Sequence, residues 1–372
     1  MKKKHILFNC MALIVLSTMI LSCKKDKAGG DNNSDIEMQV SGGGDHSLIL
    51  RSDRTLWATG FNNQGQLGDG STTNRNAPIK TADDVIAASA GVAHSLFIKS
   101  DHSLWGSGSN AKGQLGDGTT TNKTLPVKLM DNVKAVFAGH FYSFILKMDN
   151  SLWATGDNST GQLGDGTYTD KTTPVKIMDD VKTVAVFEYH TMIIKNDNTL
   201  WATGNNANGG LGDGTTTGRN TPVKIMDNVK TAALGGFHSL ILKTDNSLWA
   251  TGHNGYGELG DGTTVDKTTP VKVMDNVAAI SSGYFTSMIL KPDNSLWVCG
   301  YNSTGQLGDG TTVDKKNPVK VLDNVKAIDA GYYHSLAIKN DNSIWGSGSN
   351  LRGELGDGSN LDRTSFVKMY LP

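Results

Sequence analysis

Hydrophobic and polar residues follow one another along the chain in blocks that return every 48 residues. Tryptophan marks this period, and each copy lies in a short apolar segment bounded by polar turn residues. The seven copies are Trp57, Trp105, Trp153, Trp201, Trp249, Trp297 and Trp345. A constant period of this length is the signature of a solenoid, a propeller or a repeat array. The pattern therefore excludes two or three unrelated domains.

The repeats fill the chain from residue 37 to its end without insertion or deletion. We place the seven units at 37–84, 85–132, 133–180, 181–228, 229–276, 277–324 and 325–372. The apolar segments of the fifth unit are 229–235, 238–243, 247–252 and 270–274. They are short, are separated by Gly, Asn and Asp, and lack the 3.6-residue period of a helix. Four short strands per unit predict an all-β, seven-bladed β-propeller of four-stranded antiparallel blades.

Two further expectations concern packing. The second and third segments are almost continuously apolar, which is typical of strands covered on both faces. We therefore expect each tryptophan to lie in the core between two blades. Because the chain starts on a first segment and ends on a fourth, we expect every blade to come from one unit. The ring would then close without a strand shared between the two termini.

A glycine-rich loop beginning at Asn62 and containing Leu-Gly-Asp-Gly recurs in register in every unit. Glycine permits positive φ, and Asn and Asp side chains can bind loop backbone groups, so the loop is predicted to be structural. Spaced carboxylates such as Asp261 and Asp266 raise the alternative of calcium. However, the Asp/Asn pattern and final Glu of a calcium-binding loop are absent. We predict no metal and no cofactor.

The N-terminus has the residue pattern of an export signal. Three lysines precede an apolar run over residues 6–22, which is short for a membrane span. The run ends in Ile-Leu-Ser-Cys, which resembles the lipobox of bacterial lipoproteins. We therefore predict a lipoprotein signal peptide over 1–22, lipidation of Cys23 and a flexible tether over 23–36. An uncleaved signal anchor is the alternative. The expected location is the cell envelope, at the outer membrane or cell surface.

The charge balance excludes nucleic acid as a partner, and each of the three cysteines has an expected role. With 35 basic and 36 acidic residues, the chain has no basic field that would attract nucleic acid. Cys10 lies in the signal and Cys23 is the lipid site, which leaves Cys299 in the mature chain. Cys299 occupies a strand position held elsewhere by threonine, so we expect a buried residue and not a nucleophile. We expect a monomer.

Histidine recurs at the start of the second segment in five units, at His46, His94, His190, His238 and His334. Tyr142 and Thr286 fill the same position in the other two units. One interpretation is a ring of imidazoles that lines a channel mouth and binds metal or moves protons. The favoured interpretation is structural, with each ring bonded to a neighbouring loop carbonyl, because Tyr and Thr are not usual zinc ligands.

Taken together, these residues resemble the regulator of chromosome condensation repeat family. The shared pattern runs from A-x-G-x-x-H-S-L through D-N-S-L-W and N-x-x-G-Q-L-G-D-G to P-V-K, and it covers residues 37–372. The resemblance implies a seven-bladed propeller. The family includes a guanine-nucleotide exchange factor and an ultraviolet photoreceptor. The photoreceptor's Trp and Arg are missing beside His238 and His334, so the resemblance does not imply light sensing.

The loop between the first two segments differs between units in its content of aromatic residues, which makes it a candidate for a unit-specific function. It carries aromatic residues in units three to seven and none in the first two. The ligand-binding candidates are Phe141, Tyr142, Tyr189, Phe237, Tyr284, Phe285, Tyr332 and Tyr333. Clustered exposed aromatics are typical of contact sites, although the same rings could instead fill the channel mouth.

We therefore expect a non-enzymatic binding scaffold whose ligand is a protein, a peptide or a glycan. Two alternatives stay open. One is a hydrolytic or other enzyme that uses His and Glu188 at the channel mouth. The other is an exchange-factor-like regulator, which would require a cytosolic chain.

Overall fold

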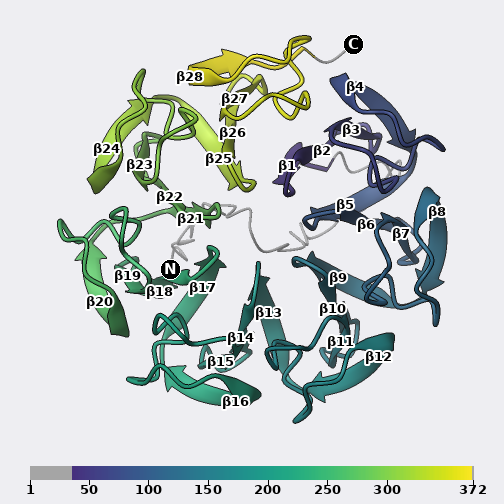
Figure 1. Ribbon diagram of the computed structural model, residues 1–372, viewed down its shortest axis with the longest axis horizontal. Coiled ribbons are helices and arrows are strands. Elements are labelled where there is room, and N and C mark those ends of the chain that lie inside the picture. Colours follow the sequence, from purple (N-terminus) through teal and green to yellow (C-terminus); the bar gives the residue numbers. More distant parts are fainter. Residues whose placement is uncertain (1–35, 371–372) are drawn as a thin grey trace, which may run out of the picture.

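The computed structural model describes residues 36–370, which form seven blades arranged in a ring (Figure 1). Each blade is one four-stranded antiparallel sheet whose strands follow one another in chain order. The predicted all-β, seven-bladed propeller is confirmed. The signal peptide, Cys23 and nearly all of the proposed tether lie outside the described residues. No helix within residues 36–370 is long and apolar enough to cross a membrane.

Each blade has one strand at each of four places, from the innermost to the outermost. The innermost strands are β1 (Gln39–Gly42), β5 (Val85–Ala90), β9 (Val133–Ala138), β13 (Val181–Val186), β17 (Val229–Leu234), β21 (Ala279–Ser282) and β25 (Val325–Ala330). The second strands are β2 (His46–Leu50), β6 (His94–Lys99), β10 (Tyr142–Lys147), β14 (His190–Lys195), β18 (His238–Lys243), β22 (Thr286–Leu290) and β26 (His334–Lys339).

The third strands are β3 (Leu56–Gly60), β7 (Leu104–Gly108), β11 (Leu152–Gly156), β15 (Leu200–Gly204), β19 (Leu248–Gly252), β23 (Leu296–Gly300) and β27 (Ile344–Gly348). The outermost strands are β4 (Arg75–Ala82), β8 (Lys123–Met130), β12 (Lys171–Met178), β16 (Arg219–Met226), β20 (Lys267–Met274), β24 (Lys315–Leu322) and β28 (Arg363–Lys368).

The hairpin between the second and third strands follows from its Asp-Asn-Ser sequence. In the fifth blade, Asn246 has a φ of 64°, a left-handed conformation that Asn tolerates better than most residues. The Asp245 carboxylate accepts hydrogen bonds from the backbone N–H and the hydroxyl of Ser247. The indole N–H of Trp249 in turn donates to the Ser247 hydroxyl. The turn and the recurring tryptophan are therefore one hydrogen-bonded unit.

The fourth strand is longer than the sequence predicts. In blade five we expect a start at Pro270, whereas β20 begins at Lys267. Proline has no N–H to donate, so within a sheet it is confined mainly to edges, strand starts and bulges. The strand tolerates it because β20 is the outer edge of its sheet and its pairing with β19 is interrupted between Ala250 and Gly252.

The hydrophobic core lies between blades. Leu146 and Leu152 of the third blade, for example, form one cluster with Val184 and Ile193 of the fourth. The ring closes in the same way, because Val40 and Ile49 of the first blade pack with Leu336 and Ile338 of the last. Within residues 36–370 no strand is shared between the first and last blades, so the predicted closure of blade against blade is confirmed.

The tryptophans lie at these interfaces but are only partly buried. Trp201, for example, packs against the cluster between blades three and four. Its indole N–H donates to the hydroxyl of Thr199, 2.9 Å away. In six blades a Lys or Arg from the end of the second strand covers the indole face, as the Lys147 ammonium does 4.5 Å from the Trp153 ring centroid. Trp therefore lies at the edge of the inter-blade core, with the polar hairpin close by.

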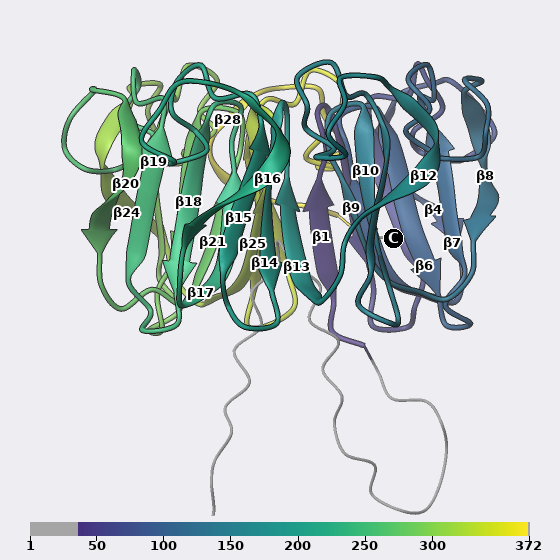
Figure 2. The same ribbon diagram turned by 90° about the horizontal axis from the view of Figure 1, so that it is seen from below.

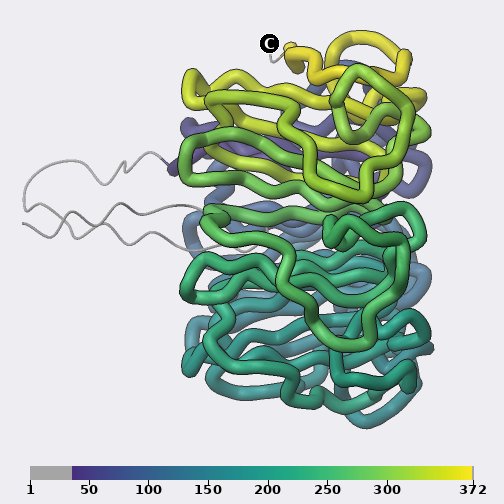
Figure 3. The backbone as a smooth tube through the Cα atoms, turned by 90° about the vertical axis from the view of Figure 1, so that its left-hand side faces the viewer, coloured from purple at the N-terminus to yellow at the C-terminus, as the bar shows by residue number. Residues whose placement is uncertain are grey.

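The two ends of the disk differ. Since strand direction alternates, the loops after the first and third strands share one end, and the hairpins and unit junctions share the other. Figure 2 shows the long loops at one end and the start of β1 towards the other. Edge-on, successive blades repeat the same backbone path (Figure 3). The chain thus enters the propeller at the end opposite the aromatic loops.

Candidate functional site

The aromatic loops of blades three to seven meet over the centre of the disk. We call this region the aromatic mouth and define it by His140, Phe141, Phe187, Tyr189, Phe237, Tyr284, Phe285, Tyr332 and Tyr333. All of these side chains are half-buried. Seven of the eight residues proposed from the sequence are thus brought together.

Tyr284 is the centre of the cluster. Its ring centroid lies 4.5 Å from that of Phe285, 5.1 Å from that of Tyr332 and 6.0 Å from that of Phe237. Phe237 stacks on Tyr189 at 5.6 Å, which extends the cluster towards blade four. Edge-to-face and offset pairs of this kind stabilise aromatic clusters beyond the area that they bury. The rings therefore support one another and present a partly exposed, preorganised surface.

Tyr142 is not part of the mouth, which corrects the sequence prediction. The residue begins β10 at the repeat position of the histidines, and its side chain is completely buried between blades three and four. The Tyr142 hydroxyl donates to the carbonyl oxygen of His190, 2.9 Å away in the next blade. Burial raises the pKa of Tyr142 well above its usual value. A residue so placed serves packing, so we remove it from the candidate site.

The sequence prediction omitted five residues at or beside the mouth, one of which is His140, stacked on Phe141. Phe187 contacts Tyr332 at 5.4 Å across the channel opening. Tyr256, Tyr301 and His253 come from the loops after the third strands, and Tyr256 lies 5.1 Å from Phe285. The sequence could have indicated Tyr256, Tyr301 and His253, because the loops after the first and third strands of an antiparallel blade must share one end.

Two histidine–carboxylate pairs lie at this end. The Nδ1 atom of His140 is 2.8 Å from Oε2 of Glu188, and Nδ1 of His253 is 2.7 Å from Oε1 of Glu258. Both glutamates are almost completely buried, whereas about a fifth of each imidazole is exposed. The hydrogen bond to Glu258 raises the pKa of His253. No Ser, Thr or Cys within residues 36–370 forms a hydrogen bond with either imidazole, so neither pair forms a nucleophile–base arrangement.

The five recurring histidines do not line the mouth. His46 is completely buried, and its Nε2 lies 3.0 Å from the hydroxyl oxygen of Ser95 in the next blade. That hydroxyl donates to the carbonyl of Gln66, so the imidazole is the donor in the pair. The structural interpretation holds, with the correction that the direct partner is a serine and the loop carbonyl comes next. Burial lowers the pKa of His46 to about 3, which keeps the ring neutral.

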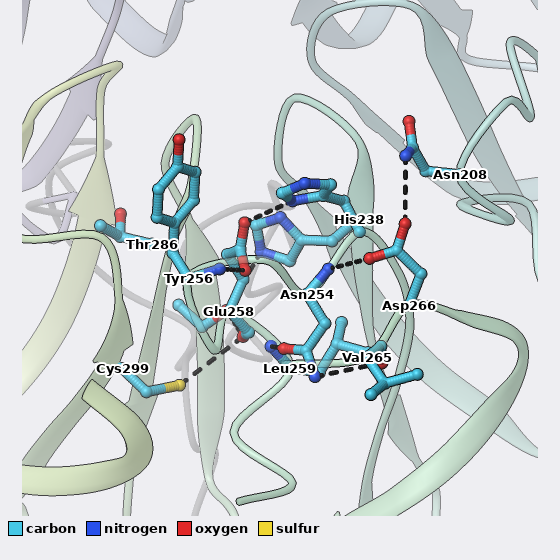
Figure 4. Close-up of polar contacts among 12 residues, drawn as sticks. Asn208, His238, Asn254, Tyr256, Glu258, Leu259, Val265, Asp266, Thr286 and Cys299 are labelled. Carbon is cyan, nitrogen blue, oxygen red and sulfur yellow. Dashed lines mark hydrogen bonds and ion pairs between the residues drawn. The ribbon is translucent and has the colours of Figure 1, made fainter. Parts of the chain in front are cut away.

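The same link joins other blades and closes the ring, where His334 of the last blade bonds Ser47 of the first. The recurring Asn loop is structural as well. Asn254 accepts a hydrogen bond from the Leu259 N–H and donates to the Val265 carbonyl (Figure 4). Asn254 also donates to the carboxylate of Asp261. Cys299 is completely buried, and its burial raises the thiol pKa. Its Sγ lies 3.6 Å from the Glu258 carbonyl.

A central channel of about 110 Å³ lies beneath the mouth, between the innermost strands. Phe187 and Tyr332 line it near the aromatic end, and Asp329 of β25 contributes an acid. The Asp329 carboxylate accepts hydrogen bonds from the Gly42 N–H and the Ser281 hydroxyl, both at 2.9 Å. Burial raises its pKa to about 7. Within residues 36–370, no group of three or more His, Cys, Asp or Glu side chains could hold a metal ion.

Comparison with solved structures shows the same fold. Human WBSCR16 is 22% identical with a TM-score of 0.76, and the match covers 86% of this chain and 94% of that one. Yeast RCC1 (Prp20), solved with Kap60 bound, is 18% identical with a TM-score of 0.77 over 95% and 91%. Prp20p of Saccharomyces cerevisiae, described with its binding to Gsp1p and histones, is 20% identical with a TM-score of 0.74 over 91% and 88%.

A search of curated protein sequences finds no match. Family models do match the chain. The model of the RCC1-like domain covers residues 22–321, and that of the regulator of chromosome condensation (RCC1) repeat covers residues 325–354. The first match spans most of the chain and agrees with the seven-fold repeat and with the observed blades. The chain therefore belongs to the RCC1-like domain family.

Proposed function

We propose that this protein is a non-enzymatic binding scaffold that holds its ligand at the aromatic mouth and is anchored by lipid in the bacterial cell envelope. An RCC1-like propeller suggests a binding or regulatory scaffold. The observation that carries the proposal is the cluster of half-buried rings at the end of the disk opposite the chain entry. A tether attached at that entry would leave the mouth facing away from the membrane.

The mouth suits a protein, a peptide or a glycan. Tyr and Phe offer large rigid contact area with few rotatable bonds to freeze on binding. Two of the similar structures are described with protein partners, namely Kap60 for one and Gsp1p and histones for the other. At 18–20% identity these likenesses concern the fold, so they do not transfer exchange activity. The histidine–glutamate pairs lack a nucleophile, which favours binding over catalysis.

The binding test uses the mature chain on peptide and glycan arrays, followed by titration of the best ligand. Phe237→Ala and Tyr333→Ala should each weaken binding by roughly 30-fold, since truncating a central aromatic anchor often costs about 2 kcal/mol. Tyr168→Ala is the matched control, because Tyr168 is 58% exposed and lies outside the mouth. If both mouth variants bind normally, or lose fold stability instead, the site lies elsewhere.

Anchoring is tested separately at Cys23, which lies outside the described residues. Cys23→Ala should abolish labelling by radioactive palmitate and should release the protein from membranes or leave it unprocessed. Cys299→Ala is the control, because that thiol is buried in the fold. A Cys23 variant that fractionates like the wild type would show that the lipoprotein prediction is wrong.

A further inference from the structure

Four exposed aliphatic side chains lie in the loops of three successive blades, at the same end of the disk as the aromatic mouth. Val265 and Val313 are each 62% exposed, Leu361 is 64% exposed and Leu351 is 69% exposed. All four lie in the loops after the third strands of blades five, six and seven. Tyr256, from the same set of loops, contacts Phe285 of the mouth. We call these five residues the apolar arc.

The repeat itself shows that the fold does not require this arc. Three of its members occupy one repeat position, at Val265, Val313 and Leu361. In the first four blades the same position holds threonine, at Thr73, Thr121, Thr169 and Thr217. Valine has the shape of threonine but lacks the hydroxyl, so the change removes polarity without filling any core. Exposed apolar side chains that the fold does not need are candidates for an interaction site.

The loops that carry the arc are held rigidly. Asn254 donates to the Val265 carbonyl, and the backbone N–H of Asn254 donates to Oδ1 of Asp266 at 2.8 Å (Figure 4). The other carboxylate oxygen of Asp266 accepts a bond from Asn208 of the preceding blade. Asn302 makes the corresponding bond to the Val313 carbonyl in blade six. The backbone that carries Val265 and Val313 is therefore held in place, which reduces the entropy lost on binding.

An exposed aspartate follows each of the three apolar residues, at Asp266, Asp314 and Asp362. None of them has an ion pair with a Lys or Arg of the described chain. The basic residue that follows each one is already paired with the Asp of the Leu-Gly-Asp-Gly loop, as Arg363 is with Asp357 at 2.6 Å. The arc thus combines exposed apolar side chains with three aspartates that pair with no Lys or Arg within residues 36–370.

We propose that the apolar arc docks a protein segment in which aliphatic side chains accompany lysine or arginine. The aliphatic groups would cover Val265, Val313, Leu351 and Leu361, and the cations would face the three aspartates, as electrostatic complementarity requires. This inference rests on the proposed scaffold function and names the chemistry of its partner. Because it lies beside the mouth and not within it, the two surfaces can be tested separately.

The charge and the aliphatic character of the arc disfavour a lipid surface, a second copy of the chain and a glycan as its occupant. An anionic lipid surface attracts Lys and Arg and would repel the aspartates of the arc. A second copy docked arc to arc would bring like charges together. Glycans are held by planar rings and polar groups, whereas the arc is mainly aliphatic.

The experiment selects binders from a library of random peptides with the mature chain as bait. Enriched peptides should pair aliphatic with basic residues, and a synthetic copy of the strongest should be titrated by calorimetry. The triple variant Val265→Thr, Val313→Thr and Leu361→Thr carries the residues of blades one to four, so it should keep the fold. It should bind this peptide at least tenfold more weakly. The reciprocal variant Thr73→Val and Thr121→Val should bind it like the wild type.

Several outcomes would overturn the inference. These are enrichment of acidic or uncharged peptides, equal binding to the triple variant, capture by anionic vesicles in place of peptide, and self-association that the triple variant abolishes. If a peptide depends on Phe237 but not on the three arc positions, the scaffold function stands and the arc does not bind. If it depends on the arc but not on Phe237, the inference stands and the mouth loses its assigned role.

Discussion

At the residue scale, unit five shows how a repeat position can exchange donor for acceptor. In unit three, the amide of Gln162 donates to the carboxylate of Asp157. In unit five the same two positions hold Glu258 and His253, and here the imidazole donates to the carboxylate. The bond is kept while its polarity is reversed. The two residues therefore depend on each other, and the exchange places an ionisable histidine beside the mouth.

Glu258→Gln should lower the pKa of His253 towards its ordinary value near 6.5, because the hydrogen bond to Glu258 is the main cause of its rise. A raised histidine pKa stabilises the fold below the unfolded pKa, and that contribution is lost as pH rises through the folded pKa. The variant should therefore lose stability chiefly at acidic to neutral pH. Imidazole proton shifts in an NMR titration measure the pKa.

Glu354→Gln is the control for this titration, because the same repeat position in unit seven accepts a bond from Ser349 and faces no histidine. An unchanged His253 pKa in the Glu258 variant would contradict the assigned cause.

At the element scale, the interface between blades three and four departs from the others. Six units have glycine three residues before the recurring His, Tyr or Thr, and the N–H of that glycine donates to the carbonyl of this residue, as Gly235 does to His238. A Cβ at Gly235 would lie 2.2 Å from the His238 ring. Unit four instead has Phe187, and its His190 carbonyl accepts the Tyr142 hydroxyl. Tyr142 thus supplies a donor to this carbonyl, and Phe187 contacts Tyr332 across the channel opening.

Tyr142→His should lower the free energy of unfolding by about 1–3 kcal/mol, because the His190 carbonyl loses its partner. Adding Phe187→Gly should recover much of that loss, since glycine can restore the backbone bond found in the other blades. Denaturant unfolding of both single variants and the double variant measures the coupling free energy. Strictly additive effects would show that the two substitutions are independent.

At the scale of the whole molecule, ring closure depends on contacts between the last blade and its neighbours. Asp329 is the one acid among the described residues that line the channel, and it bonds both Ser281 of blade six and Gly42 of blade one. Serine occupies its repeat position at Ser41 and Ser89, where it accepts the corresponding N–H of the next blade. A carboxylate therefore does at the closure what a hydroxyl does elsewhere.

Asp329→Ser should remove part of the pH dependence of stability. The pKa of Asp329 is raised from 3.8 to about 7, so the folded state holds the proton more tightly than the unfolded state. Wild-type stability gained from this group is therefore present at low pH and falls as pH rises from about 4 to about 7. One pKa unit corresponds to about 1.4 kcal/mol, so the loss is at most a few kcal/mol.

Urea unfolding at pH 5 and pH 8 tests this prediction as a difference between the variant and the wild type. Ser89→Ala, at the same repeat position in blade two, is the control and should leave the pH dependence as it is. An identical pH dependence in Asp329→Ser and wild type would contradict the assigned role.

Sequence alone determined the architecture of this protein. Seven blades are predicted by the 48-residue period and by the four apolar segments in each unit. Turn residues such as Asn246, which has a positive φ, mark the hairpins. These features depend on local sequence and recur in every unit. The buried Asn loop, the burial of Cys299 and the structural role of the histidines were predictable for the same reason. Repetition shows what every blade needs.

Only the tertiary structure decided which side chains share a site. Tyr142 and Tyr189 are both candidates from the sequence, yet Tyr142 is buried between blades and Tyr189 lies at the mouth. Tyr142 begins a strand, whereas Tyr189 lies in the loop before one. Phe187, the Glu258–His253 pair and the apolar arc also required the fold. They depend on contacts between loops that are distant along the chain, and a periodic pattern specifies each blade but not the differences between neighbours.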